Sequence, residues 1–360
     1  MFPYFLVFSL TLIFFSVGNQ TANNKQLGGR LFIAVALILL ISFAAYRSSW
    51  VGTDTRTYLA LWNDIQNSNF NDGWLYSEPL FYWLQIVTRY IADNTFLGKE
   101  VFLGAISALV CILTFSAINQ VSKNKVLSLF VFLFLGFYTF HFNGARQAIA
   151  MALFIYSIKY ILTGNAKKYA LIVFVGFLFH KTMLITVPFY FLFRLKFTPK
   201  IVALIVISTI VASFSITNIV DYASEFDVRY KSYASSDFTG GIIQVLFFTF
   251  ILIWLYIAKK VNRINEKLYD ISLVSMLLSV CIGWMSVALS LNPSGILRLT
   301  GYFAQFMIFC LPISVLAFPR SNFRSLVLLA FVSLSILYFY LTTSNFSGLA
   351  PYSLDVDLLF

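Results

Sequence analysis

Long apolar segments separated by short polar segments dominate this chain. A helix needs about 20 predominantly apolar residues to cross a bilayer, and the pattern predicts about twelve such segments. The predicted segments cover residues 2–17, 31–46, 96–118, 126–140, 145–162, 169–179, 182–195, 201–219, 242–258, 271–291, 296–318 and 325–342. We therefore expect an all-α, polytopic membrane bundle that forms one transmembrane domain over residues 1–360.

The basic residues set the expected orientation of these segments. Lys25 and Arg30 follow the first segment, so the positive-inside rule places the N-terminus outside. Residues 169–195 are long for one helix and short for two. A single crossing there would turn later basic loops, such as the one with Lys259, to the outside. We therefore predict two short helices or a re-entrant hairpin with His180 at its tip, and both termini on the outer face.

This orientation leaves two long loops on the outer face, residues 47–95 and 218–241. Long loops that carry their own structure are commonly functional. Within the first loop, residues 79–91 are apolar and aromatic but too short to span a bilayer. They predict an interfacial or packed helix.

The composition agrees with a membrane protein and excludes several classes of site. The chain is 60% hydrophobic and only 11% charged, whereas soluble domains carry roughly a quarter charged residues. Its net charge of +11 could indicate a nucleic-acid partner, but the charges lie in short loops between apolar segments, so none is expected. The two histidines and three cysteines lack metal-ligand spacing, and we expect no metal or other cofactor.

Three basic residues stand at predicted outer ends of helices, namely Arg146, His180 and Arg298. Backbone N–H groups and the helix dipole favour anions at a helix N-terminus, and arginine suits bidentate contact with phosphate. The set therefore predicts an anion site. The alternatives are that each arginine reaches to lipid headgroups or pairs with an outer acid, and that His180 is a hydrogen-bonded packing residue.

Two acids of the first outer loop, Asp54 and Glu78, are candidates for a general base that takes a proton from a substrate hydroxyl. Arg56 could tune Asp54 or merely pair with it. Pro79 suits the first position of a helix, so Glu78 could instead interact with the helix dipole.

Short motifs in a fixed order connect these residues to a known family. The motifs are Gly52-Thr53-Asp54-x3-Tyr58, Glu78-Pro79-Leu80-Phe81, Arg146-Gln147-x2-Ala150, Phe179-His180-Lys181-Thr182, Arg298-x3-Tyr302 and Pro351-Tyr352. Each is weak alone, but the ordered set covers nearly the whole chain. On these motifs the chain resembles the EpsG-like and Wzy-type polysaccharide polymerases of bacterial envelopes.

The resemblance implies a GT-C-like membrane glycosyltransferase of the bacterial inner membrane, with its site facing the periplasm or outside. Such enzymes join oligosaccharide repeat units carried on undecaprenyl diphosphate, for O-antigen, capsule or exopolysaccharide. Arg146 and Arg298 would hold the donor diphosphate, His180 would contact phosphate or orient the acceptor hydroxyl, and Asp54 or Glu78 would be the base. The implied sugar or acceptor contacts are Arg56, Tyr58, Tyr82, Gln147 and Tyr302.

The implied partners are the lipid-linked oligosaccharide, the bilayer and a chain-length regulator protein. Two alternative functions remain at this point. An O-antigen ligase-like transferase would use the same diphosphate site, so the sequence separates it poorly from a polymerase. A flippase or exporter of lipid-linked oligosaccharide would carry polar residues deep along a central cavity. The charges lie mostly at the membrane borders, which favours a one-sided site.

Overall fold

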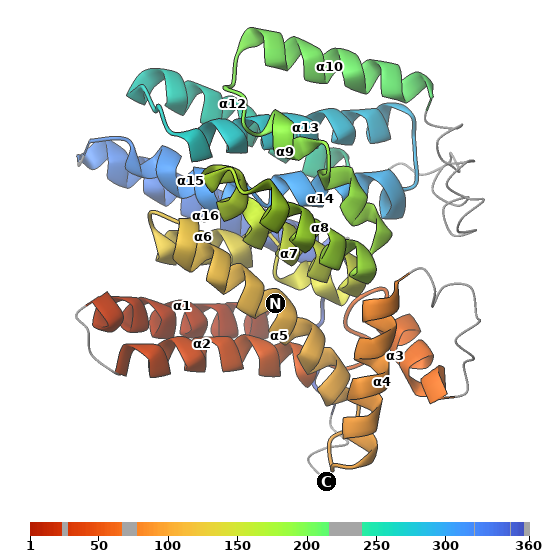
Figure 1. Cartoon of the computed structure of the whole chain (residues 1–360). Coiled ribbons are helices and arrows are strands. Elements are labelled where there is room, and N and C mark those ends of the chain that lie inside the picture. Colours follow the sequence, from red (N-terminus) through yellow and green to blue (C-terminus); the bar gives the residue numbers. More distant parts are fainter. Residues whose placement is uncertain (24–27, 67–77, 216–239, 320, 346, 356–360) are drawn as a thin grey trace. The chain divides into compact units, whose positions relative to one another are not determined.

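The chain is helical throughout most of the part that its computed structural model describes (Figure 1). Within that part there is no strand, only an isolated bridge between Arg47 and Leu354. The expected all-α class is confirmed. The structure describes residues 1–23, 28–66, 78–215, 240–319, 321–345 and 347–355.

The chain divides into two compact units. The first comprises Met1–Lys159, Ala170–Leu184 and Leu326–Phe360, and the second comprises Tyr160–Tyr169 and Ile185–Ser325. We describe each unit by itself, and the single transmembrane domain expected from the sequence stays a prediction.

The helices of the first unit are α1 (Phe2–Asn23), α2 (Gly28–Ala45), α3 (Thr55–Asn63), η1 (Asp64–Gln66), α4 (Pro79–Asp93), α5 (Lys99–Val121), α6 (Lys125–Phe134) and η2 (Thr139–Phe142). Those of the second are α9 (Phe189–Leu192), α10 (Pro199–Phe214), α12 (Ile242–Asn262), α13 (Lys267–Ala288), η5 (Pro293–Leu297), α14 (Arg298–Ala304) and α15 (Met307–Leu316). Four helices have residues in both units: α7 (Ala145–Thr163), α8 (Ala166–Phe179), η3 (Lys181–Thr186) and α16 (Asn322–Asn345).

Aromatic side chains form the core of the first unit, where α1, α2, α6 and α16 meet. The ring of Phe8 lies 5.5 Å from that of Phe134 and 5.4 Å from that of Phe339, and the Tyr4 ring lies 5.2 Å from that of Phe43. Most of these pairs are edge-to-face, the arrangement that the ring quadrupole favours. Van der Waals packing of this kind drives helix association where lipid is as apolar as the side chains.

Serine hydroxyl groups join the helices of the second unit. Ser275 on α13 donates a hydrogen bond to the Phe303 carbonyl at 2.9 Å, and Ser279 donates to the Thr300 carbonyl at 3.1 Å. Both serines are fully buried, where an unpaired hydroxyl would be costly. These bonds therefore satisfy both hydroxyl groups and hold α14 against α13.

Eight helices in the described part of the chain are long and apolar enough to cross a membrane, and the bent pair Gly295–Ala304 and Met307–Leu316 could be a ninth. These nine coincide with nine of the predicted segments. The other three correspond to α8, to Lys181–Leu192 and to α10, which are shorter helices. The chain is a polytopic helical membrane protein, and its twelve crossings stay a prediction.

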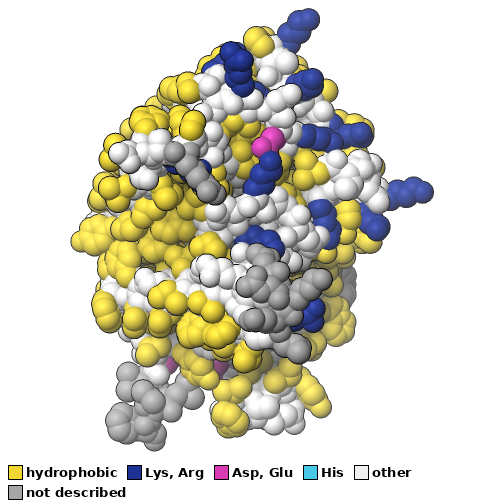
Figure 2. All heavy atoms as spheres, turned by 90° about the vertical axis from the view of Figure 1, so that its left-hand side faces the viewer, with side chains coloured by type: hydrophobic (Ala, Val, Ile, Leu, Met, Phe, Trp, Pro, Cys, Tyr) yellow, Lys and Arg dark blue, Asp and Glu magenta, His cyan; other side chains and the backbone are white. Residues whose placement is uncertain are grey.

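Basic residues are exposed at the ends of several helices, as Figure 2 shows for one face of the molecule. In the second unit, Lys259 and Lys260 end α12 and Lys267 begins α13. Lys259 forms an ion pair with Asp270 in the first turn of α13. A lysine-rich connection of this kind is typical of a cytoplasmic loop, although the orientation itself stays a prediction.

The predicted outer loop 47–95 contains α3 and α4, while residues 67–77 within it lie outside the described residues. Helix α4 is two-faced, with Phe81 and Gln85 buried and Trp83 and Val87 exposed. It runs across the direction of α1 and α2 (Figure 1). Residues 79–91 therefore form the helix expected here, packed on one face and apolar on the other. The second predicted loop, 218–241, lies outside the described residues except for its last two positions.

Residues 347–355, the C-terminal tail, form hydrogen bonds with the start of the first loop and with the end of η2. The amide of Gly52 donates to the Gly348 carbonyl at 2.8 Å. Asn143 accepts a hydrogen bond from the Thr53 amide through Oδ1 and donates from Nδ2 to the Ser347 carbonyl, each at 2.8 Å. Because Asn143 lies three residues before Arg146, these contacts help to fix where α7 begins.

Gly52 is required by this arrangement, and replacing it with alanine should destabilise the protein. Its φ of +96° lies in the left-handed region, and a Cβ atom would stand 2.6 Å from the Phe142 carbonyl oxygen. Strain of this kind costs about 1–3 kcal/mol. We expect Gly52→Ala to lower the midpoint of thermal unfolding in detergent. Gly28→Ala is the matched control, because nothing lies within 4 Å of its added Cβ; equal midpoints for the two variants would contradict the account.

Candidate active site

A buried carboxylate is the centre of the candidate site. Glu78 immediately precedes α4, and Pro79 occupies the first position of that helix. The Glu78 side chain is completely buried and does not cap α4. A buried carboxylate is costly unless charged or hydrogen-bonding groups compensate it. Its partners therefore define what the site can do.

Arg146 is the first of these partners, at the second position of α7. Its Nη1 donates to Glu78 Oε2, and the Tyr58 hydroxyl is a further hydrogen-bond partner. The guanidinium carbon lies 5.7 Å from the Tyr58 ring centroid and 5.9 Å from that of Phe81. Only 16% of the Arg146 side chain is exposed. Glu78 and the two aromatic rings thus hold the guanidinium in one orientation.

His180 is the second partner, at the junction between α8 and η3. Its Nδ1 lies 2.5 Å from Glu78 Oε1, and 17% of its side chain is exposed. The His180 amide donates to the Gly176 carbonyl, and its own carbonyl accepts from Met183. Because an ionised carboxylate only accepts hydrogen bonds, Nδ1 carries the proton in this contact. Glu78 therefore holds Arg146 with one oxygen and His180 with the other.

The structure thus brings together three residues that the sequence analysis singled out, all of them in the first unit. Glu78 comes from the outer loop, and the other two stand at the borders of apolar helices. Glu78 thus holds the side chains of Arg146 and His180 in place. That arrangement favours a positioning role over the general-base role or the dipole interaction considered from the sequence.

Asp54 and Arg56 lie at the start of α3. Asp54 is the residue before the helix, and its Oδ1 accepts a hydrogen bond from the Thr53 hydroxyl at 2.9 Å. The Arg56 guanidinium lies 3.8 Å from the ring centroid of Trp50. The stacking covers one face of Trp50, an exposed residue.

The aromatic and amide candidates differ in their surroundings. Tyr58 is buried beside Arg146 and 5.8 Å from the Phe81 ring. Tyr82 packs with Ile65 in a small cluster. Gln147 is buried on α7. Tyr58 therefore lies against the cluster of Glu78, Arg146 and His180, called the Glu78 cluster below.

Arg298 and Tyr302 belong to α14 in the second unit, where Arg298 begins the helix and Tyr302 is fully buried. The predicted sharing of one diphosphate by Arg146 and Arg298 therefore stays a prediction. In the part of the chain that the structure describes, no group of three or more His, Cys, Asp or Glu side chains is arranged to hold a metal ion.

Sequence reasoning missed two residues that support this end of the first unit. Asn143 bridges the first loop and the C-terminal tail. Arg47 is 2% exposed and stacks 4.1 Å from the Phe142 ring centroid. Burial lowers the pKa of Arg47 to about 10, so the guanidinium stays charged at neutral pH. The sequence does carry a signal for Arg47, because an arginine stands directly after the apolar segment 31–46.

The sequence model of the EpsG family matches residues 30–354, which includes every candidate site residue. No curated protein and no solved structure matches the chain.

Proposed function

The chain belongs to the EpsG family, and from this premise we propose that it is a membrane glycosyltransferase that polymerises oligosaccharide repeat units carried on undecaprenyl diphosphate. The products would be O-antigen, capsule or exopolysaccharide, made on the periplasmic or outer face of the bacterial inner membrane. Its partners would be the lipid-linked oligosaccharide and a chain-length regulator.

The observation that carries this proposal is the buried Glu78 carboxylate between Arg146 and His180. A guanidinium has five N–H donors in a planar fork, so Arg146 can contact Glu78 and still donate to a phosphate oxygen. The site is built on the ends of apolar helices, where the headgroup of a lipid-linked substrate would lie. Arg146 would then stabilise the diphosphate as it leaves.

The reaction needs a base as well as a stabilised leaving group. In the proposed step, the acceptor hydroxyl oxygen forms a bond to the anomeric carbon of the donor. The bond from that carbon to the diphosphate oxygen breaks, and its electron pair leaves with the diphosphate. The hydroxyl proton passes to Nε2 of His180. Because Glu78 accepts a hydrogen bond from Nδ1–H, it selects the tautomer in which Nε2 is unprotonated and basic.

Asp54 remains the second candidate for the base, since it was expected from the sequence and stands in the same unit. Arg298 would contribute a second guanidinium to the diphosphate. Arg56, Tyr58, Tyr82, Gln147 and Tyr302 stay proposed contacts to the sugars or the acceptor, and all of them except Arg56 are buried.

Substitution of Arg146 tests the diphosphate contact. We expect both Arg146→Ala and Arg146→Lys to lower the rate of repeat-unit joining about a hundredfold or more, the usual loss for one donor that stabilises developing charge. Lysine should fail because a single ammonium cannot reproduce the planar fork. The measurement is glycan chain length on gels from cells with equal amounts of protein.

Lys159→Ala is the matched control for this test, because Lys159 lies near the other end of α7 and donates to Gln120. It should leave chain length unchanged. Long glycan chains at normal levels in both Arg146 variants would refute the diphosphate contact.

A further inference from the structure

A polar cavity lies in the first unit, where the ends of α3 and α4 meet the start of α5 and the C-terminal tail. Its volume is about 470 Å³, within the roughly 300–1,000 Å³ of ligand pockets. The cavity is lined by Trp62, Asn63, Arg89, Ala92, Asp93, Gly98, Lys99, Glu100 and Asp355. None of these residues belongs to the Glu78 cluster.

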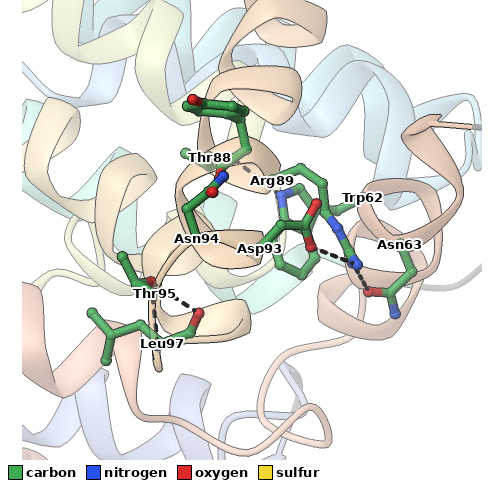
Figure 3. A network of polar contacts seen from close by, with 9 residues as sticks. Trp62, Asn63, Thr88, Arg89, Asp93, Asn94, Thr95 and Leu97 are labelled. Atoms are coloured by element: carbon green, nitrogen blue, oxygen red, sulfur yellow. Dashed lines mark hydrogen bonds and ion pairs between the residues drawn. The ribbon is translucent and has the colours of Figure 1, made fainter.

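One wall of the cavity is held rigidly by Arg89 (Figure 3). Its Nη1 donates to Asn63 Oδ1 at 3.2 Å, and its Nη2 lies 3.0 Å from Asp93 Oδ1. The guanidinium carbon stands 5.0 Å from the ring centroid of Trp62. Trp62 itself donates from Nε1 to the Thr88 hydroxyl at 3.0 Å. The polar groups of this wall are therefore fixed before any ligand arrives.

Another part of the lining joins α5 to the C-terminal tail. Lys99 forms an ion pair with Asp355. Glu100 is buried, and its Oε2 accepts a hydrogen bond from the Gly98 amide at 2.9 Å. The tail is held in place by a bond from the Ser48 amide to the Ser353 carbonyl, at 2.9 Å.

The lining selects one class of ligand. The lining contains two cations, Arg89 and Lys99, and three carboxylates, Asp93, Glu100 and Asp355. The three carboxylates would repel an anion such as phosphate, and the two cations would repel a cationic ligand. Sugar hydroxyl groups both donate and accept hydrogen bonds, so they match a lining that mixes donors with acceptors. An uncharged, polyhydroxylated ring fits this chemistry.

We propose that this cavity is a binding subsite for a sugar ring of the glycan, away from the bond that reacts. Helix α4 joins the two places, and eleven residues separate Glu78 from Arg89, or roughly 16 Å at the helical rise. A ring held here is one of the glycan's more distant rings, because the lipid diphosphate binds at Arg146. The identity of the ligand rests on the proposed function. A sugar ring bound here would keep the glycan on the protein between additions, and the cavity would thereby set the chain length.

Two substitutions test this inference, one that fills the cavity and one that removes a polar group from its lining. Ala92→Phe places a ring in the cavity, and Asn63→Ala removes one lining amide from an exposed position. Val87→Phe is the matched control, because Val87 lies on the exposed apolar face of α4. The probe is a mixture of oligosaccharides released by mild acid from the cells' own polysaccharide. Calorimetry measures their binding to the purified full-length protein in detergent, and gels measure glycan length in cells.

We expect Ala92→Phe to weaken oligosaccharide binding at least tenfold and to shorten the glycan, while single linkages still form. Asn63→Ala should have the same effects to a smaller degree, and Val87→Phe should match the wild type. Wild-type binding and wild-type glycan length in both cavity variants would overturn the inference. Failure of the proposed function is distinguishable, because then the wild-type protein would join no repeat units whether or not it binds the oligosaccharides.

Discussion

Replacing Glu78 with glutamine is expected to abolish the synthesis of long glycan. Each Glu78 oxygen holds a different side chain, Arg146 or His180. A glutamine amide keeps only one acceptor and would turn an N–H₂ donor toward a second donor. Breaking a buried ion pair by removing one partner costs about 3–5 kcal/mol. We therefore expect the rate of repeat-unit joining to fall by more than a hundredfold.

The measurement for Glu78→Gln is the initial rate of joining by purified protein, with thermal unfolding recorded alongside to show that the variant is folded. Asp64→Asn is a suitable control, since it removes an exposed acid from the same loop. The control should keep the wild-type rate. A folded Glu78→Gln protein that polymerises as fast as the control would show that the carboxylate does not organise the site.

The second large effect is expected for His180→Gln. Loss of a general base typically lowers a rate by about 10²–10⁴-fold. A base must be unprotonated to act, so the wild-type rate should fall as the pH is lowered and the imidazole takes up a proton. This fall is the acid limb of the pH profile. In His180→Gln the residual rate should no longer fall as the pH is lowered. A residue that only shaped the site would lower the rate and leave the acid limb in place.

The control for the pH profile is His141→Gln, which replaces the other histidine of the chain. His141 is buried, and its Nδ1 contacts the Tyr138 carbonyl rather than a carboxylate. The variant should keep the acid limb even if its stability is lower. An acid limb that persists in His180→Gln would reassign the base, and Asp54 would be the next residue to test.

The hydrophobic pattern predicted the helices well, because a membrane span must satisfy its backbone groups within one continuous apolar segment. Segments such as 96–118 and 271–291 correspond to α5 and α13. The pattern was less informative over residues 169–219. There Gly176, Pro188 and Pro199 interrupt apolar stretches, and the helices α8, α9 and α10 are short. The sequence placed His180 between two short helical segments, where the structure also has it.

The candidate site could be predicted only as a set of separate residues. Glu78 lies 68 positions from Arg146 and 102 from His180 in the sequence. No local pattern specifies which loop acid meets which helix end, because the outcome depends on how α4 and α7 pack. The role of Asn143 could not be predicted for the same reason, because its partners are 90 and 204 positions away in the sequence. Arg298 was joined to the set by its predicted place at the outer end of a helix and by its motif.

The most direct test of the central claim is a polymerisation assay with purified components. Wild-type and Glu78→Gln proteins would each be mixed with an undecaprenyl-diphosphate-linked oligosaccharide in detergent, with no energy source, and the products separated by size. We expect the wild type to lengthen the glycan and release undecaprenyl diphosphate, while the folded variant does neither. A wild-type protein that leaves the substrate at its original length would contradict the polymerase function, and a fully active Glu78→Gln variant would contradict the site.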